Sequence, residues 1–205
     1  MSELAMQGRA GRLLLLSRLS TTRRGAELLD RKRQLLQADL AELASAREEA
    51  GKCFEATCSA AEEWSRRAAL LGGQSDLSLA ADSLEGRAEI EISWRNSMGV
   101  ALPDRFTCSL PSLNPLQLAA LNAAMGPAAA ACRAALEAAV AYAIADEAYR
   151  RVNEELAATR RRARAIEKYR LPALEAALCS VEQRLDELDR DERVVARWSR
   201  SRTVQ

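Results

Sequence analysis

The 205-residue chain is rich in leucine and alanine and almost neutral. Hydrophobic residues make up 48% of it but aromatic residues only 4%, a composition typical of long helices. Thirty basic residues balance 29 acidic ones, which excludes a global attraction to nucleic acid or anionic lipid. Histidine is absent, so the commonest general base and metal ligand are missing.

The first predicted element is a long helix from residue 11 to residue 71. Steps of four and three residues from Leu15 meet apolar side chains almost throughout, and the exceptions are Thr22, Arg33, Arg47 and Thr57. Such a sustained heptad pattern predicts a coiled coil roughly 90 Å long. A helix of this length needs a partner helix, and Gly72-Gly73 is the predicted end.

Residues 72–114 form the predicted connector, because prolines, serines and asparagines are concentrated there. The segment AEIEISW alternates apolar and polar residues, RNSMG follows as a turn, and VAL precedes Pro103. This pattern predicts a β-hairpin near residues 88–102. Its candidate contact residues are Ile90, Ile92, Trp94, Met98 and Val100.

A second long helix is predicted over residues 115–200. Asn114-Pro115 has the pattern of a helix start, with proline in the first turn. The apolar pattern runs to Ile166 and restarts one residue late at Leu171. Because Pro172 lies at this offset and the heptads resume, we expect the helix to bend there without stopping.

The fold class predicted from these elements is all-α. Two long helices pair as an antiparallel coiled coil, with a small β-hairpin in the middle segment, as a single elongated domain over residues 1–205. Pairing Leu71 with Leu118 places Arg12 beside about Leu178. The segment Cys179–Arg200 then projects past its partner.

No residue pattern in this chain indicates catalysis. A GxxxxGK[ST] phosphate loop is absent, and the five scattered cysteines contain no C-x-x-C pair. Acidic pairs such as Glu48-Glu49 are typical of solvated helix faces. The apolar run Ala134–Ala145 is too short to cross a bilayer. We therefore expect no catalytic residue, no cofactor-binding residue, no metal site and no direct membrane insertion.

The arginines near both ends of the chain admit several interpretations. A basic region before leucine heptads also occurs in DNA-binding zippers, but here the heptads run through the basic region. Pairs such as Arg23/Glu27 favour a helix surface with salt bridges. Antiparallel pairing also gathers the arginines of both helices at one end, as a basic tip suited to an electronegative collar. The candidate partner-contact residues are Arg9, Arg12, Arg23, Arg24, Arg160, Arg161, Arg162, Arg193, Arg197 and Arg200.

Three segments resemble the D subunit, the central rotor shaft, of V-type and A-type rotary ATPases. They are LLLLSRLSTTRRGAELLDRKRQLL (residues 13–36), AEIEISWRNSMGVALP (88–103) and TRRRARAIEKYRLPALEAALCSVEQRLDELDRDERVVARW (159–198). Together they include parts of both helices and the hairpin, in the family's order.

The resemblance implies a non-catalytic shaft that couples ATP hydrolysis or synthesis in a hexameric head to proton or sodium transport. Its implied partners are head subunits A and B, the F subunit of the central stalk and the funnel subunit (C/d) on the membrane ring. It implies no direct nucleotide or nucleic acid, and a cytoplasmic location peripheral to the membrane. The alternative from the basic tip alone is a stand-alone coiled-coil scaffold or nucleic-acid-binding rod.

Overall fold

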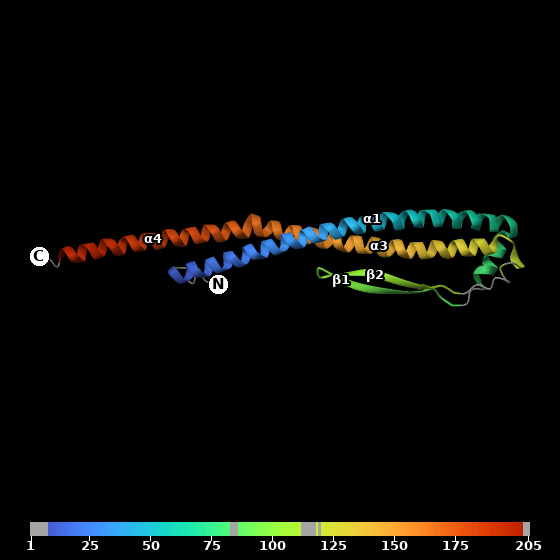
Figure 1. The fold of residues 1–205 in the computed structure, drawn as a ribbon, viewed down its shortest axis with the longest axis horizontal. Coiled ribbons are helices and arrows are strands. Elements are labelled where there is room, and N and C mark those ends of the chain that lie inside the picture. The colour runs from blue at the N-terminus through green and yellow to red at the C-terminus, as the bar shows by residue number, and fades with distance from the viewer. Residues whose placement is uncertain (1–7, 83–85, 112–117, 119, 203–205) are drawn as a thin grey trace. The chain divides into compact units, whose positions relative to one another are not determined.

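The computed structural model describes residues 8–82, 86–111, 118 and 120–202 (Figure 1). The first long helix is α1 (Gly8–Asp82). It is followed by the strands β1 (Glu89–Ser97) and β2 (Val100–Ser109). The helix α3 (Met125–Ala165) continues through a π-helical segment η2 (Ile166–Arg170) into α4 (Leu171–Arg202).

The chain divides into two compact units. The terminal unit comprises Met1–Leu35 and Leu156–Gln205, and the hairpin unit comprises Leu36–Glu155. In the terminal unit Arg12 meets Glu182 and Arg23 meets Glu175, so the helices run antiparallel. In the hairpin unit Arg47 meets Asp146 and Ser65 meets Cys132, again in antiparallel order. The predicted two-helix coiled coil with a hairpin is confirmed, while the single-domain expectation stays a prediction.

The predicted seam of α1 is the face that packs. Every predicted seam position from Leu15 to Ala68 is buried or half-buried, the Thr and Arg positions included. Leu71, the last predicted position, is 66% exposed. The antiparallel register differs from the prediction by about one turn, because Arg12 pairs with Glu182 and not with a residue near Leu178. Pairing continues to Arg9 and Asp189, so the predicted overhang from Cys179 is too long.

The first helix is interrupted at the predicted Gly72-Gly73 position, and a second helical segment that the sequence did not predict follows it. Gly73 has φ 72° and ψ −177°, which interrupts the helix, but helical structure then resumes as far as Asp82. At the corner, the Asn122 side-chain amide donates to Asp76 Oδ2 at 3.1 Å. A Cβ atom on Gly72 would lie 1.8 Å from that same Asp76 oxygen, so a larger residue there would require the Asp76 and Asn122 side chains to move.

The helix α3 begins at Met125, but Leu118, Ala120 and Leu121 before it are also helical, and the predicted cap Asn114-Pro115 lies outside the described residues. The start depends on Asn122, whose side-chain oxygen accepts the Ala124 N–H at 3.1 Å. Pro127 follows in the first turn, where a missing backbone N–H costs no helix hydrogen bond. Here the core consists of small side chains, because Ala124 and Ala128 pack with Met125, Leu118 and Ala68.

The predicted seam offset near Pro172 corresponds to the π-helix η2. The Leu171 N–H donates to the Ile166 carbonyl, five residues back, so one extra residue is inserted into the helix. That extra residue explains why the apolar pattern restarts one position late. Pro172 follows directly, and the helix continues to Arg202. The prediction that the helix does not stop is confirmed, and its bend stays a prediction.

The hairpin is longer than predicted. A two-residue turn joins its strands, and Met98 (φ 52°) and Gly99 (φ 82°) both have positive φ, as a type I′ turn requires. We expected the second strand to end before Pro103, but β2 reaches Ser109. A register shift at Ser93/Trp94 places Pro103 at an irregular position of the ladder, where its missing N–H is tolerated.

Candidate partner-binding surfaces

Three of the predicted arginines form ion pairs between the helices of the terminal unit. Arg12 Nε lies 2.8 Å from Glu182 Oε1, and an Arg23 guanidinium nitrogen lies 2.8 Å from Glu175 Oε1. Arg9 lies 3.5 Å from Asp189. All six side chains are more than 40% exposed, so each pair contributes at most about 1 kcal/mol. Their geometric effect is to fix the register of the two helices.

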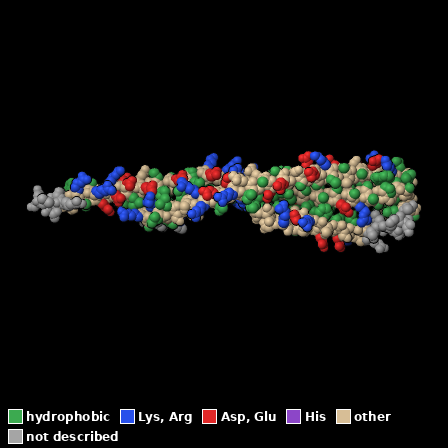
Figure 2. All heavy atoms as spheres, in the orientation of Figure 1, with side chains coloured by type: hydrophobic (Ala, Val, Ile, Leu, Met, Phe, Trp, Pro, Cys, Tyr) green, Lys and Arg blue, Asp and Glu red, His purple; other side chains and the backbone are tan. Residues whose placement is uncertain are grey.

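The remaining predicted arginines lie on the solvent side of the same unit. Those described as exposed are Arg24, Arg160, Arg161, Arg162, Arg193 and Arg197, while the side chain of Arg200 lies outside the described residues. Residues 8–35 and 156–202 together carry 20 basic and ten acidic side chains. On the face drawn in Figure 2, both signs alternate along this unit. Its basic excess therefore remains after the interhelical pairs are formed.

The hairpin unit has the opposite charge. Residues 36–155 contain ten basic and 18 acidic side chains. A neutral chain is thus divided into a basic unit and an acidic unit, a contrast that the overall net charge of +1 conceals. The sequence interpretation identified the basic part and missed the acidic part.

A polar and aromatic cluster joins α1 to α3 within the hairpin unit. Arg47 Nε lies 2.6 Å from Asp146 Oδ1, and the guanidinium covers the Tyr149 ring at 5.2 Å. Contact with Asp146 and then with Tyr142 raises the pKa of Arg47. The Phe54 and Tyr142 rings stack with centroids 6.0 Å apart. The backbone of Gly51 lies against the Tyr142 ring, because a Cβ there would be 3.4 Å from it, at van der Waals contact. This cluster explains why Arg47 occupies a position of the predicted seam.

The turn end of the hairpin is attached to both long helices. Arg151 donates to the Ala101 carbonyl at 3.1 Å and covers the Trp94 ring at 4.8 Å. Its Nε also donates to Glu147 at 2.6 Å, which orients the guanidinium. From α1, Asp39 accepts a hydrogen bond from Ser97 Oγ at 3.1 Å. Leu102 between these contacts is fully buried.

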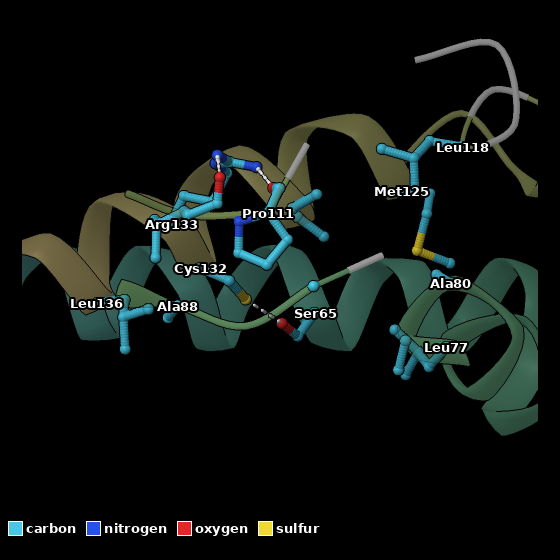
Figure 3. Close-up of a pocket in the computed structure, with 15 residues that line it drawn as sticks. Ser65, Leu77, Ala80, Ala88, Pro111, Leu118, Met125, Cys132, Arg133 and Leu136 are labelled. Carbon is cyan, nitrogen blue, oxygen red and sulfur yellow. Dashed lines mark hydrogen bonds between the residues drawn. The ribbon is translucent and has the colours of Figure 1, made fainter. Parts of the chain in front are cut away.

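The base of the hairpin is held by a second arginine of α3. Figure 3 shows Arg133 reaching the carbonyl oxygen of Pro111 at 2.6 Å, and it also donates to Leu110 at 3.3 Å. Beneath it is an apolar cavity of about 460 Å³, with Leu77, Met125 and Leu136 in its walls. The sequence interpretation missed both Arg133 and Arg151, because isolated arginines on a helix do not indicate which backbone they meet.

Between these attachments one face of the hairpin is apolar and partly exposed, with the Trp94 ring covered on one side by Arg151. Ile90 is paired with Cys108, Ile92 with Phe106 and Trp94 with Pro103, so their side chains share a face. The exposed fractions are 46% for Ile90, 40% for Ile92 and 52% for Trp94. Met98 in the turn is 46% exposed and Val100 is half-buried. The five predicted hairpin residues are thus accessible to a partner.

The apolar part of α3 is longer than the sequence interpretation assumed. Within the described residues, the continuous helix Met125–Ser199 is long and apolar enough to cross a bilayer by length and composition. Two observations oppose insertion. Arg133 and Glu137 lie inside its alanine-rich stretch, and charges at a membrane centre each cost about 3 kcal/mol. Arg133 is also bonded to the hairpin base. The absence of direct membrane insertion stays a prediction.

The described residues contain no group of three or more Cys, Asp or Glu side chains that could hold a metal, and all five cysteines are free thiols.

The family model for the D subunit of ATP synthase matches residues 12–201. The chain is 28% identical to the V-type ATP synthase D subunit of Thermotoga neapolitana, over 90% of this chain and 91% of that protein. It is 30% identical to the A-type ATP synthase D subunit of Pyrococcus horikoshii, over 62% of this chain and 60% of that protein.

Proposed function

The chain belongs to the family of ATP synthase D subunits, and from this premise we propose that it is the central rotor shaft of a V/A-type rotary ATPase. In this role it couples ATP hydrolysis or synthesis in the head to proton or sodium transport across the membrane. The observation that carries the proposal is the family match over residues 12–201, which includes both helices and the hairpin.

The shaft acts mechanically and is not catalytic. A coiled coil with different side chains on each face presents a different surface to each of the equivalent head sites as it turns. Each site then changes its preferred conformation, because contact with the shaft favours one state over another. The interhelical contacts of Arg12 with Glu182 and of Arg47 with Asp146 keep the helices in register during rotation.

The charge division suggests which partners meet each unit. The basic terminal unit suits an electronegative collar formed by head subunits A and B. The acidic hairpin unit and its partly exposed apolar face suit the F subunit of the stalk and the funnel subunit (C/d) of the membrane ring. The shaft is accordingly cytoplasmic and peripheral to the membrane, held there by the complex.

Rotation of the chain inside its own complex tests this function. The variant keeps Cys53, which is exposed, as its single cysteine. Biotin-maleimide labels this thiol, a streptavidin-coated bead binds the biotin, and the head of the complex is fixed to a surface. We expect the bead to rotate in one direction when ATP is added and to stop when ATP is replaced by a non-hydrolysable analogue. Hydrolysis by the assembled complex with a stationary bead would contradict the rotor function. Binding of the isolated chain to DNA at about 50 mM salt, with a steep salt dependence, would favour the nucleic-acid-binding alternative.

A further inference from the structure

We propose that Arg133 and Arg151 are positioning residues which clamp β2 to α3, so that the hairpin and its apolar face stay at a fixed place on the shaft. The inference rests on the proposed rotor function and assigns it two residues outside the predicted contact set. Both arginines belong to the hairpin unit, as do the strands that they hold.

The spacing of the two arginines matches the length of the strand. They are 18 residues apart on α3, which is five helical turns, so both lie on one face about 27 Å apart. Their acceptors are the carbonyl of Ala101 near one end of β2 and those of Leu110 and Pro111 just past the other. Nine residues of strand span about 30 Å. The strand therefore lies antiparallel to α3, as the ribbon in Figure 1 shows, and the hydrogen bonds place one arginine at each end.

The chemistry of both clamps requires arginine. Arg133 uses two nitrogens to meet two successive carbonyls, a fork that the single ammonium of lysine does not reproduce. Arg151 donates to Ala101 while its plane covers Trp94 and its Nε is held by Glu147. A lysine at position 151 would lose the planar stacking and one of these donors.

The clamps matter because, among the described residues, the other attachments of the hairpin to the helices are few, chiefly the Ser97–Asp39 hydrogen bond and the buried Leu102. An isolated two-stranded hairpin is at best marginally stable in water. Along β1 every residue from Glu89 to Asn96 is exposed, and only Leu102 and Pro103 of β2 are buried. Hydrogen bonds to charged groups stabilise more than those between neutral groups. Without the clamps we expect the strands to move away from α3, and the apolar face to lose its fixed position on the rotor.

Hydrogen exchange of the isolated full chain tests the clamps directly. Arg133→Gln/Arg151→Gln should raise exchange over residues 89–109 roughly tenfold or more, because local opening becomes easier. The matched control Arg160→Gln/Arg161→Gln, which alters two exposed arginines of the terminal unit, should leave that exchange unchanged. Unchanged exchange in the clamp variant would overturn the proposal and would leave the rotor function untouched.

The positioning role is then tested in the reconstituted complex by a reversible bridge. Ser97 Oγ and Asp39 Oδ2 are 3.1 Å apart, so Asp39→Cys/Ser97→Cys, with the five native cysteines changed to serine, can be joined by a disulfide or a short bis-maleimide. In the clamp variant we expect the ratio of ions pumped to ATP hydrolysed to fall below that of the wild-type chain, because the hairpin no longer keeps one place on the rotor. The bridge should restore the ratio, and reduction of the disulfide should abolish the rescue.

The two readouts separate this inference from the proposed function. If exchange rises but coupling stays normal, the positioning role is wrong although the clamps exist. If coupling falls and the bridge does not restore it, the arginines act by something other than position, and the proposal is again wrong. If even the wild-type chain fails to join the complex, the rotor function fails, and the exchange result still decides whether the clamps hold the hairpin.

Discussion

The terminal unit and the hairpin unit use one antiparallel helix pair but hold it together differently. In the terminal unit the described interhelical polar contacts include three exposed ion pairs, from Arg9, Arg12 and Arg23. In the hairpin unit the contacts between α1 and α3 include stacked rings and the Arg47–Asp146 pair beside two tyrosines. The ion pairs of both units are exposed and contribute little free energy, so the stacked rings are the interhelical contact that distinguishes the hairpin unit.

The largest effect should come from the apolar seam that both units share. Leu156→Ala in the terminal unit and Leu36→Ala in the hairpin unit remove fully buried side chains, and each should lower the free energy of unfolding by about 2–4 kcal/mol. Urea unfolding followed by circular dichroism measures this. Leu28→Ala, at a side chain 64% exposed, is the control and should change the free energy by less than about 0.5 kcal/mol. Equal losses at all three positions would contradict the seam assignment.

Replacing one glycine in each unit with alanine should change the stability of the protein in opposite directions. Gly73→Ala in the hairpin unit places a side chain at φ 72° and should destabilise the fold by about 1–2 kcal/mol. Gly25→Ala in the terminal unit meets no atom within 4 Å and should stabilise its helix by about 0.5–1 kcal/mol. Thermal unfolding of the two variants should shift in opposite directions. A stabilised Gly73→Ala would show that the corner does not require positive φ.

Charge reversal tests the ion pairs of the terminal unit. Arg12→Glu places a second carboxylate beside that of Glu182. It should lower the free energy of unfolding by about 0.5–1 kcal/mol at low salt. Arg12→Glu/Glu182→Arg restores opposite charges and should recover most of that free energy. Both differences should shrink at about 1 M salt, where charges are screened. A single variant whose loss is the same at high salt would indicate packing rather than charge.

The smallest expected effect is a pH dependence confined to the hairpin unit. The hydrogen bond from Arg151, and then that from Arg150, lowers the pKa of Glu147 below its ordinary value of 4.5. Because the folded state favours the carboxylate, its stabilisation is complete above that value and is lost as pH falls through the lowered pKa. Exchange over residues 89–109, corrected for intrinsic rates, should rise slightly as the pH falls below the ordinary pKa of 4.5. Glu147→Gln should abolish this pH dependence, and a persistent rise would implicate another carboxylate.

Sequence periodicity was sufficient for the helices and the turn of the hairpin. The spacing from Leu15 to Ala68 identified the packed face of α1, because a heptad pattern directly reflects burial. The Asn96–Gly99 segment identified the turn, because Gly99 tolerates the positive φ that a two-residue turn needs.

What periodicity missed depends on contacts distant in the sequence. The start of α3 is fixed by Asn122, which meets Asp76 of the preceding helical segment, and Asn114-Pro115 gave a stronger local signal. The predicted pairing of Leu71 with Leu118 gave a register about one turn from the observed one, in which Arg12 meets Glu182. Likewise, β2 passes Pro103 because the ladder is irregular opposite Trp94, and Arg133 is placed by carbonyls about twenty residues away.

The π-helix η2 sets the rotation of α4 about its own axis relative to α3. Removing one residue from Ile166–Arg170 would shorten the helix by only about 1.5 Å but would rotate all of α4 by about 100° around its own axis. Glu175, Glu182 and Asp189 would then turn away from Arg23, Arg12 and Arg9 together. The one residue inserted in the π-helix thus sets which face of α4 is turned toward α1.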